Sequence, residues 1–259
     1  MKRYFLLFGS VFFLFFPSKS KGQDVEDDPM PGGWSLGVST GFQYAVSSSM
    51  HGEITEYESA LAAGATAAQY PFAGNRAYAI GFGAQIEKRI RRSPVSLYVN
   101  AYGMSLRAGN GFRNAEGGRY TMTVLSTSGG IEYTFGQLYQ SWNFYGRIGI
   151  VSSTIGISNR GSSDRFSDSL RLSGSDSRIG IEIEVGERYH FPRSAIGIEA
   201  SINYTNVNLF GKSYTDPANA GGLFSRGSFI NDGKNPDDAN DTPRTIDFLS
   251  LRVGARIYF

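Results

Sequence analysis

The chain of 259 residues contains no cysteine and only two histidines, His51 and His190. The lack of cysteine excludes disulfide bridges, thiolate metal sites, cysteine nucleophiles and a lipid anchor attached through cysteine. Two histidines are too few for a histidine-rich metal cluster. Glycine is abundant instead, with 33 residues, alongside 15 tyrosines and 19 phenylalanines. This combination is unusual for a soluble enzyme.

Long apolar runs are also lacking, except at the start of the chain. The apolar stretch 4–16 follows Lys2 and Arg3 and ends at Pro17, and Ser20-Lys21-Gly22 precedes an expected cleavage site. The stretch is shorter than the ~20 residues of a membrane helix, which favours a secretory signal peptide over residues 1–22 rather than an uncleaved anchor. Residues 23–33 are then expected to form a periplasmic linker.

The chain has little net charge, formally +2. Residues 1–22 contain Lys2, Arg3, Lys19 and Lys21 and no acidic residue, so their removal leaves a slightly acidic chain. The sequence therefore gives no compositional support for a nucleic-acid partner.

Beyond the signal peptide, apolar and polar residues alternate. Ile181, Ile183 and Val185, for example, alternate with Glu182 and Glu184. Because successive side chains of a strand point to opposite faces, this period predicts strands with one apolar and one polar face. The pattern occurs in eight segments: 34–44, 78–87, 95–107, 120–135, 142–153, 179–186, 196–204 and 249–259.

The apolar face of segment 95–107 is ambiguous. One alternative places Leu97, Val99 and Ala101 outside, and the other Tyr98, Tyr102, Met104 and Leu106. A bulge at Gly103 would switch the two faces.

The connections alternate in length. Those at Lys88–Pro94, Gly136–Ser141 and Tyr189–Ser194 are short, whereas the others are mostly longer, such as 46–76 and 207–243. Short turns at one end and long loops at the other are typical of outer-membrane barrels. The sequence predicts an all-β fold, an eight-stranded antiparallel up-and-down transmembrane β-barrel over residues 34–259, with the last strand closing on the first and both termini in the periplasm.

Three features favour an apolar exterior over an apolar core. The polar faces carry glycine, serine and charged residues that would fill a narrow interior, and the chain begins with an export signal. Aromatic residues gather near the short turns, as in an interfacial girdle. These are Trp34, Tyr133, Phe135, Trp142, Phe144, Tyr189, Phe191, Tyr258 and Phe259. The alternative is a secreted soluble barrel of lipocalin type with these residues in its core.

The chain resembles the OmpA/OmpX-like eight-stranded outer-membrane barrels over residues 34–259. The most specific element is the alternating end, Leu251 to Phe259, which finishes on an aromatic residue. In that family, Tyr258 and Phe259 would form the signal read by the barrel-assembly machinery. The resemblance also implies a location in the cell outer membrane, among lipid and lipopolysaccharide. No peptidoglycan-binding domain is expected, because nothing follows Phe259.

The inward positions predict a charge network in the lumen. We expect Glu87, Glu132, Arg147, Glu182, Glu184, Glu199, Arg252 and Arg256 to face the interior. Buried charges must pair, so Arg147 should meet Glu182 or Glu184, and Arg252 or Arg256 should meet Glu199. The network is expected to act as a structural plug; the alternative is a gated pore of small conductance.

We expect no catalytic, cofactor or metal site. Lipid-modifying barrel enzymes need a histidine beside a serine nucleophile, but His51 and His190 lie at opposite ends of the expected barrel. The stretch Asn231–Asp241 is rich in oxygen ligands suited to Ca²⁺ but lacks the final glutamate of an EF-hand. A solvated acidic loop is the alternative that its composition favours.

The sequence therefore predicts a non-enzymatic outer-membrane barrel that serves as an envelope structural or surface-interaction component through long extracellular loops. The alternatives are a small pore or a transport or secretion accessory barrel, then a lipid-modifying enzyme, and last a soluble ligand carrier. The ligand of the loops is unknown.

Overall fold

Eight strands make up the regular structure of the computed structural model. It describes residues 33–46, 78–90, 93–107, 119–135, 141–160, 173–213, 232–234, 236–237, 239, 242–243 and 245–259. The strands are β1 (Trp34–Ala45), β2 (Tyr78–Arg89), β3 (Val95–Arg107), β4 (Arg119–Phe135), β5 (Trp142–Arg160), β6 (Ser173–His190), β7 (Ile196–Phe210) and β8 (Asp247–Tyr258). The expected signal peptide, the linker and His51 lie outside the described residues.

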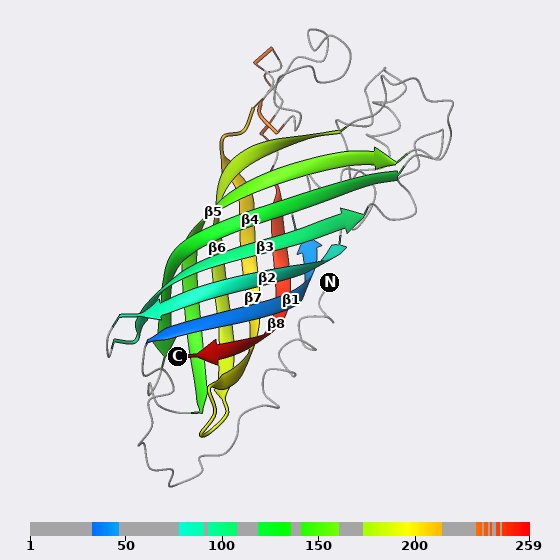
Figure 1. The fold of residues 1–259 in the computed structure, drawn as a ribbon. Coiled ribbons are helices and arrows are strands. Elements are labelled where there is room, and N and C mark those ends of the chain that lie inside the picture. Colours follow the sequence, from blue (N-terminus) through cyan, green and yellow to red (C-terminus); the bar gives the residue numbers. More distant parts are fainter. Residues whose placement is uncertain are drawn as a thin grey trace, which may run out of the picture.

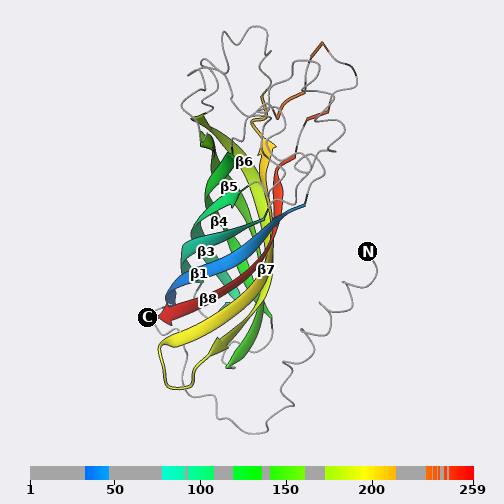
Figure 2. The same cartoon turned by 90° about the vertical axis from the view of Figure 1, so that its right-hand side faces the viewer.

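The strands form a closed barrel in which each pairs antiparallel with its neighbour in the sequence (Figure 1). The barrel closes between β1 and β8, which lie side by side in Figure 2. At this seam Trp34 and Phe259 exchange two backbone hydrogen bonds of 3.0 Å. The predicted up-and-down barrel, with its last strand on its first, is confirmed.

The two ends of the barrel differ in their connections. The connections after β2, β4 and β6 are short, and we call this end the turn end. The connections after β1, β3, β5 and β7 span 46–77, 108–118, 161–172 and 211–246, and this is the loop end. β4, β5 and β6 are the longest strands, with 17, 19 and 18 residues.

Burial alternates along the strands, with apolar side chains outside and polar ones inside. In β8, Leu251 and Val253 are 49% and 54% exposed, whereas Arg252 between them is 7% exposed. A soluble barrel would have the opposite arrangement, because its apolar side chains would form the core. No helix within the described parts of the chain is long and apolar enough to cross a membrane.

The ambiguity in β3 is resolved without a bulge. Leu97 and Val99 are each 51% exposed, whereas Tyr98 and Tyr102 are buried. The pairing of β3 with β2 and β4 continues without a shift through Gly103. The bulge considered at Gly103 is therefore wrong, and tyrosines fill this side of the lumen because their hydroxyl groups find polar partners there.

Most of the aromatic residues expected at the turn end lie on the outside. Trp34, Tyr133, Phe135, Phe144, Phe191 and Phe259 are 40–54% exposed. Their rings contact one another, as in the pair Tyr133–Phe135 with centroids 5.0 Å apart. Tyr258 was expected among these outer aromatic residues, but it is 5% exposed and faces the lumen. Strand alternation places it on the face opposite to Phe259.

Two adjacent glycines of β4 should respond oppositely to alanine. A Cβ at inward-facing Gly130 would lie 2.6 Å from Gly149 Cα, whereas at outward-facing Gly129 the nearest heavy atom is 3.7 Å away. We expect Gly130→Ala to destabilise the barrel by about 1–3 kcal/mol through overpacking. Gly129→Ala should be neutral or slightly stabilising. Urea unfolding of both variants in detergent measures the difference, and equal midpoints would contradict the close approach of β4 and β5.

Candidate functional site: the barrel interior

The polar faces of the strands converge in the lumen as a lumen charge network. The members predicted from the sequence are all at most 9% exposed: Glu87, Glu132, Arg147, Glu182, Glu184, Glu199, Arg252 and Arg256. They come from β2, β4, β5, β6, β7 and β8. Each lies on the inward face because it shares the parity of its strand's buried residues.

Arg147 joins three neighbouring strands. It lies directly opposite Glu132 on β4 and Glu184 on β6. Its Nε donates to Glu132 at 2.7 Å and its Nη1 to Glu184 at 2.8 Å. Nη1 also donates to the side-chain oxygen of Gln85 on β2, at 2.8 Å. The guanidinium lies over the ring of Tyr145, 4.6 Å from its centroid. One arginine thus ties β4, β5 and β6 together and reaches across the lumen.

Arg256 joins β8 to β7 and β2. Its Nη2 donates to Glu199 at 2.7 Å, and its Nη1 donates to Ser35 at 2.7 Å and also to Glu87. Of the expected partners of Glu199, the structure therefore brings Arg256 to it. Arg252 instead contacts Glu184, at 3.2 Å, and lies over the ring of Tyr102.

Arg188, which the sequence pattern did not predict, contacts the lumen charge network near the turn end. It is 4% exposed and donates to Glu132 at 3.0 Å, with Glu87 at 3.4 Å and Glu199 at 3.5 Å. The predicted strand stopped at 186, whereas β6 continues to His190. The available signal was parity, because Arg188 continues the inward series of Glu182 and Glu184.

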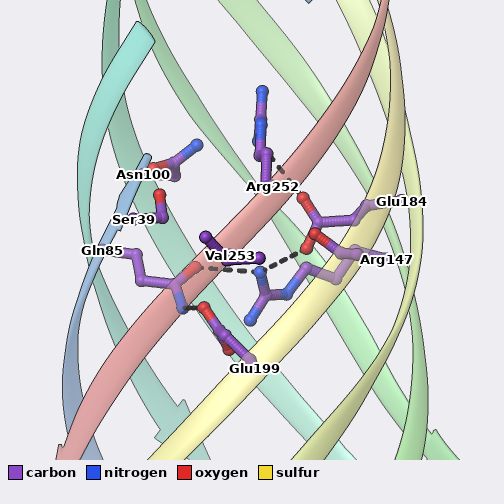
Figure 3. A pocket seen from close by; sticks show the side chains of 9 residues that line it. Ser39, Gln85, Asn100, Arg147, Glu184, Glu199, Arg252 and Val253 are labelled. Carbon is purple, nitrogen blue, oxygen red and sulfur yellow. Dashed lines mark hydrogen bonds and ion pairs between the residues drawn. The ribbon is translucent and has the colours of Figure 1, made fainter. Parts of the chain in front are cut away.

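Neutral side chains complete the network. Glu182 accepts a hydrogen bond of 2.7 Å from the Tyr98 hydroxyl. Arg147 was one expected partner of Glu182, but Glu182 pairs with this tyrosine of β3 instead. Gln85 donates to Glu199 at 2.7 Å while accepting from Arg147 (Figure 3). A cavity of about 10 Å³ lies beside Gln85, Arg147 and Glu199, three of the lining residues that Figure 3 draws. That volume is close to the least that one water molecule needs.

Buried apolar side chains also line the lumen nearer the loop end. We call them the apolar collar: Ala45, Ala79, Leu106, Val124, Val151, Ile155, Val207 and Phe248, each 0–3% exposed. The strand register places several of its members opposite one another, including Ala45 with Phe248, Ala79 with Leu106, and Val124 with Ile155. The lumen toward the loop end is therefore filled by aliphatic and aromatic side chains together with buried polar ones, such as Ser153 and Arg178, which pair in the register between Val151 and Ile155.

The structure describes His190 and part of the stretch that could bind Ca²⁺. His190 packs its ring against Tyr258 at the turn end, with centroids 4.8 Å apart. Of the stretch Asn231–Asp241, Asp232 is fully buried and accepts hydrogen bonds from Arg178. Within the described residues there is no group of three or more acidic or histidine side chains suited to a metal ion. Several members of the proposed calcium loop lie outside those residues.

These features define a class: an eight-stranded up-and-down β-barrel with a charged and apolar filling and an apolar exterior. The resemblance inferred from the sequence is confirmed for the fold. Neither protein-family models nor curated protein sequences give a match.

Several solved structures are similar to this chain at low sequence identity. The chain is similar to Neisserial surface protein A, with 13% identity, 88% of this chain and 97% of that chain covered, and a TM-score of 0.46. It is also similar to the outer membrane protein OprG from Pseudomonas aeruginosa, with 9% identity, 90% and 100% covered, and a TM-score of 0.44. A major outer membrane protein from Thermus thermophilus gives 12% identity, 86% and 99% covered, and a TM-score of 0.44. These likenesses concern the fold alone.

Proposed function

We propose that this chain is an integral outer-membrane protein that acts as a non-enzymatic envelope component, structural or surface-interacting, with a closed barrel. The single observation that carries this proposal is the inverted polarity of the barrel. Phe82, Ile150 and Ile80 are 68%, 67% and 63% exposed on the outside, while charged side chains fill the inside. An apolar surface that encircles the whole barrel is far larger than soluble monomers expose, and a bilayer is the solvent that suits it.

The dimensions of the strands agree with a bilayer. A transmembrane strand needs roughly 9–11 residues at a tilt near 45°, and the shortest strands here have 12 residues. The outward aromatic residues at the turn end suit one membrane interface. The turn end would then face the periplasm and the loop end the cell exterior, with lipid and lipopolysaccharide around the apolar surface. The barrel-assembly machinery would read the end of β8, where Phe259 is exposed and Tyr258 faces the lumen.

The filling of the lumen favours a structural or surface-interacting barrel over a pore. The lumen charge network links facing walls of the barrel through Arg147 with Gln85 and through Arg188 with Glu87, and the apolar collar lies nearer the loop end. An eight-stranded barrel leaves little interior space once its side chains are placed. Interaction with an extracellular partner would therefore fall to the connections at the loop end, where such barrels carry their variable surface.

Two measurements test the proposal. We expect a heat-dependent mobility shift on an SDS gel of the outer-membrane fraction, because a closed barrel with paired backbone groups resists SDS until it is heated. We also expect no resolved single-channel steps when the folded protein is placed in planar bilayers. A soluble periplasmic protein without the shift would overturn the membrane assignment, and stable conductance steps would favour the small pore instead.

A further inference from the structure

The pairing of β6 with β7 is irregular near the loop end. The register shifts between Ile179 and Ile181, and the backbone of β7 presses onto Gly180. A Cβ added at Gly180 would lie 2.7 Å from the carbonyl carbon of Asn206, so glycine is needed for this close approach. Arg178 precedes the shift on β6, on its loop-end side, and is only 3% exposed although it lies close to the rim.

Arg178 holds a carboxylate that comes from a distant part of the chain. Its Nε donates to Oδ2 of Asp232 and its Nη2 to Oδ1, both at 2.8 Å, which is the two-pronged geometry of a strong arginine–carboxylate pair. The backbone N–H of Ser213 donates to Oδ1 at 3.0 Å, and the amide of Asn208 donates to Oδ2 at 3.0 Å. Four donors satisfy the hydrogen-bonding capacity of this fully buried carboxylate.

The same contacts bring two points of the β7–β8 connection together. The N–H of Gly233 donates to the carbonyl of Ser213 at 2.8 Å, and Nη2 of Arg178 also donates to the hydroxyl of Ser213 at 3.1 Å. Gly211, with φ of +82°, supplies the left-handed turn that leads the chain from β7 to Ser213. Ser213 and Asp232 are the residues that flank segment 214–231, so the two ends of that segment are joined at its base.

The return of the chain to β8 is fastened separately. Oδ1 of Asn208 accepts a hydrogen bond of 2.7 Å from the N–H of Ile246, and the N–H of Val207 donates to the carbonyl of Ile246 at 2.9 Å. Asn208 therefore serves both fastenings, one through its oxygen and one through its nitrogen. Neither fastening uses a member of the lumen charge network.

We propose that Arg178 and Asp232 form a clamp that fixes the two ends of segment 214–231 to the rim of the barrel. The clamp orders the base of this connection as a unit separate from the barrel below. The inference concerns the folded chain alone and holds whether or not the barrel conducts ions.

Hydrogen–deuterium exchange of the full chain, folded in detergent micelles, tests the clamp. Asp232→Asn keeps the shape of the side chain but weakens its bonds to Arg178, which remains paired with Asp176 at 2.8 Å. We expect the amides of Ser213 and Gly233 to exchange about tenfold faster or more in this variant, because they lose a charge-assisted network. Peptides from β1 to β4 should exchange as in the unaltered chain, and the heat-dependent gel shift should persist.

Two further variants sharpen the result. Asp237→Asn makes the same chemical change at an exposed residue of the same connection and should leave exchange unaltered. Arg178→Lys keeps the charge but loses the two-pronged geometry, and it should act in the same direction as Asp232→Asn. Unchanged exchange at Ser213 and Gly233 would overturn the clamp. Faster exchange throughout the barrel, or failure of both clamp variants to fold, would show that the pair belongs to the barrel core and would overturn its separateness.

Discussion

Replacement of Arg147 by alanine is expected to destabilise the folded barrel by about 3–5 kcal/mol, since the change strands buried carboxylates without their partner. Glu132 and Glu184 lie on either side of Arg147, with their carboxylates 2.7 and 2.8 Å from its guanidinium. Glu132 would keep Arg188, whereas Glu184 would depend on Arg252 and on neutral donors. The void left by the side chain adds to the cost.

Urea unfolding of the refolded barrel in detergent measures this loss of stability. The heat-dependent gel shift reports the fraction of protein that is folded at each urea concentration. Arg193→Ala is the control, because Arg193 is an exposed arginine in the turn between β6 and β7. The double variant Arg147→Ala with Glu184→Gln should recover part of the stability that Arg147→Ala loses, as expected for two residues in direct contact. An unfolding free energy equal to that of the control would refute the pairing scheme.

An arginine placed on the apolar exterior should be the second most damaging change. Ile150 on β5 is 67% exposed and points outward. If a bilayer surrounds it, Ile150→Arg should cost about 2–4 kcal/mol, the range for arginine near the membrane midplane. If water surrounds it, the same change should have an effect within about 0.5 kcal/mol, because exposed surface positions tolerate charge. The size of the loss thus separates a membrane barrel from a soluble one.

The chain offers a matched control on the same face of the same strand. Thr154 is exposed. At the usual rise per residue of a strand, it lies roughly 13 Å further toward the loop end than Ile150. Thr154→Arg should therefore have little effect in lipid vesicles, since the cost of arginine falls toward the interface. Folding yield and unfolding free energy in vesicles measure both variants. Equal tolerance of the two would speak against a bilayer around β5.

The local pattern of the sequence was enough to predict where the strands lie and that each has an apolar and a polar face. Alternation along a strand is a property of neighbouring residues, so Leu251 and Arg252 are assigned to opposite faces without any knowledge of the fold. The order of the strands followed from the short connections, and the closure of β8 on β1 from their number. The inward orientation of charges such as Glu132 and Arg147 required only parity.

The limits of strands and their irregularities were harder to predict. Arg188 was missed because apolar alternation fades before the strand ends, although backbone pairing continues to His190. The faces of β3 stayed ambiguous because tyrosine suits a lumen lined with carboxylates as well as it suits a membrane interface. Tyr258 was grouped with the outer aromatic residues by composition, although its parity placed it inside.

By itself, the sequence determined that eight two-faced strands exist, in which order they pair, and that charged side chains such as Glu132 and Arg147 face the lumen. Only the tertiary structure decided which charges meet, such as Arg188 with Glu87 or Gln85 with Arg147. Those partners come from strands that face each other across a tilted barrel, and their distance depends on the tilt and stagger of all the strands together. The clamp of Arg178 and Asp232 likewise joins residues that are 54 positions apart in the chain, a meeting that no local pattern encodes.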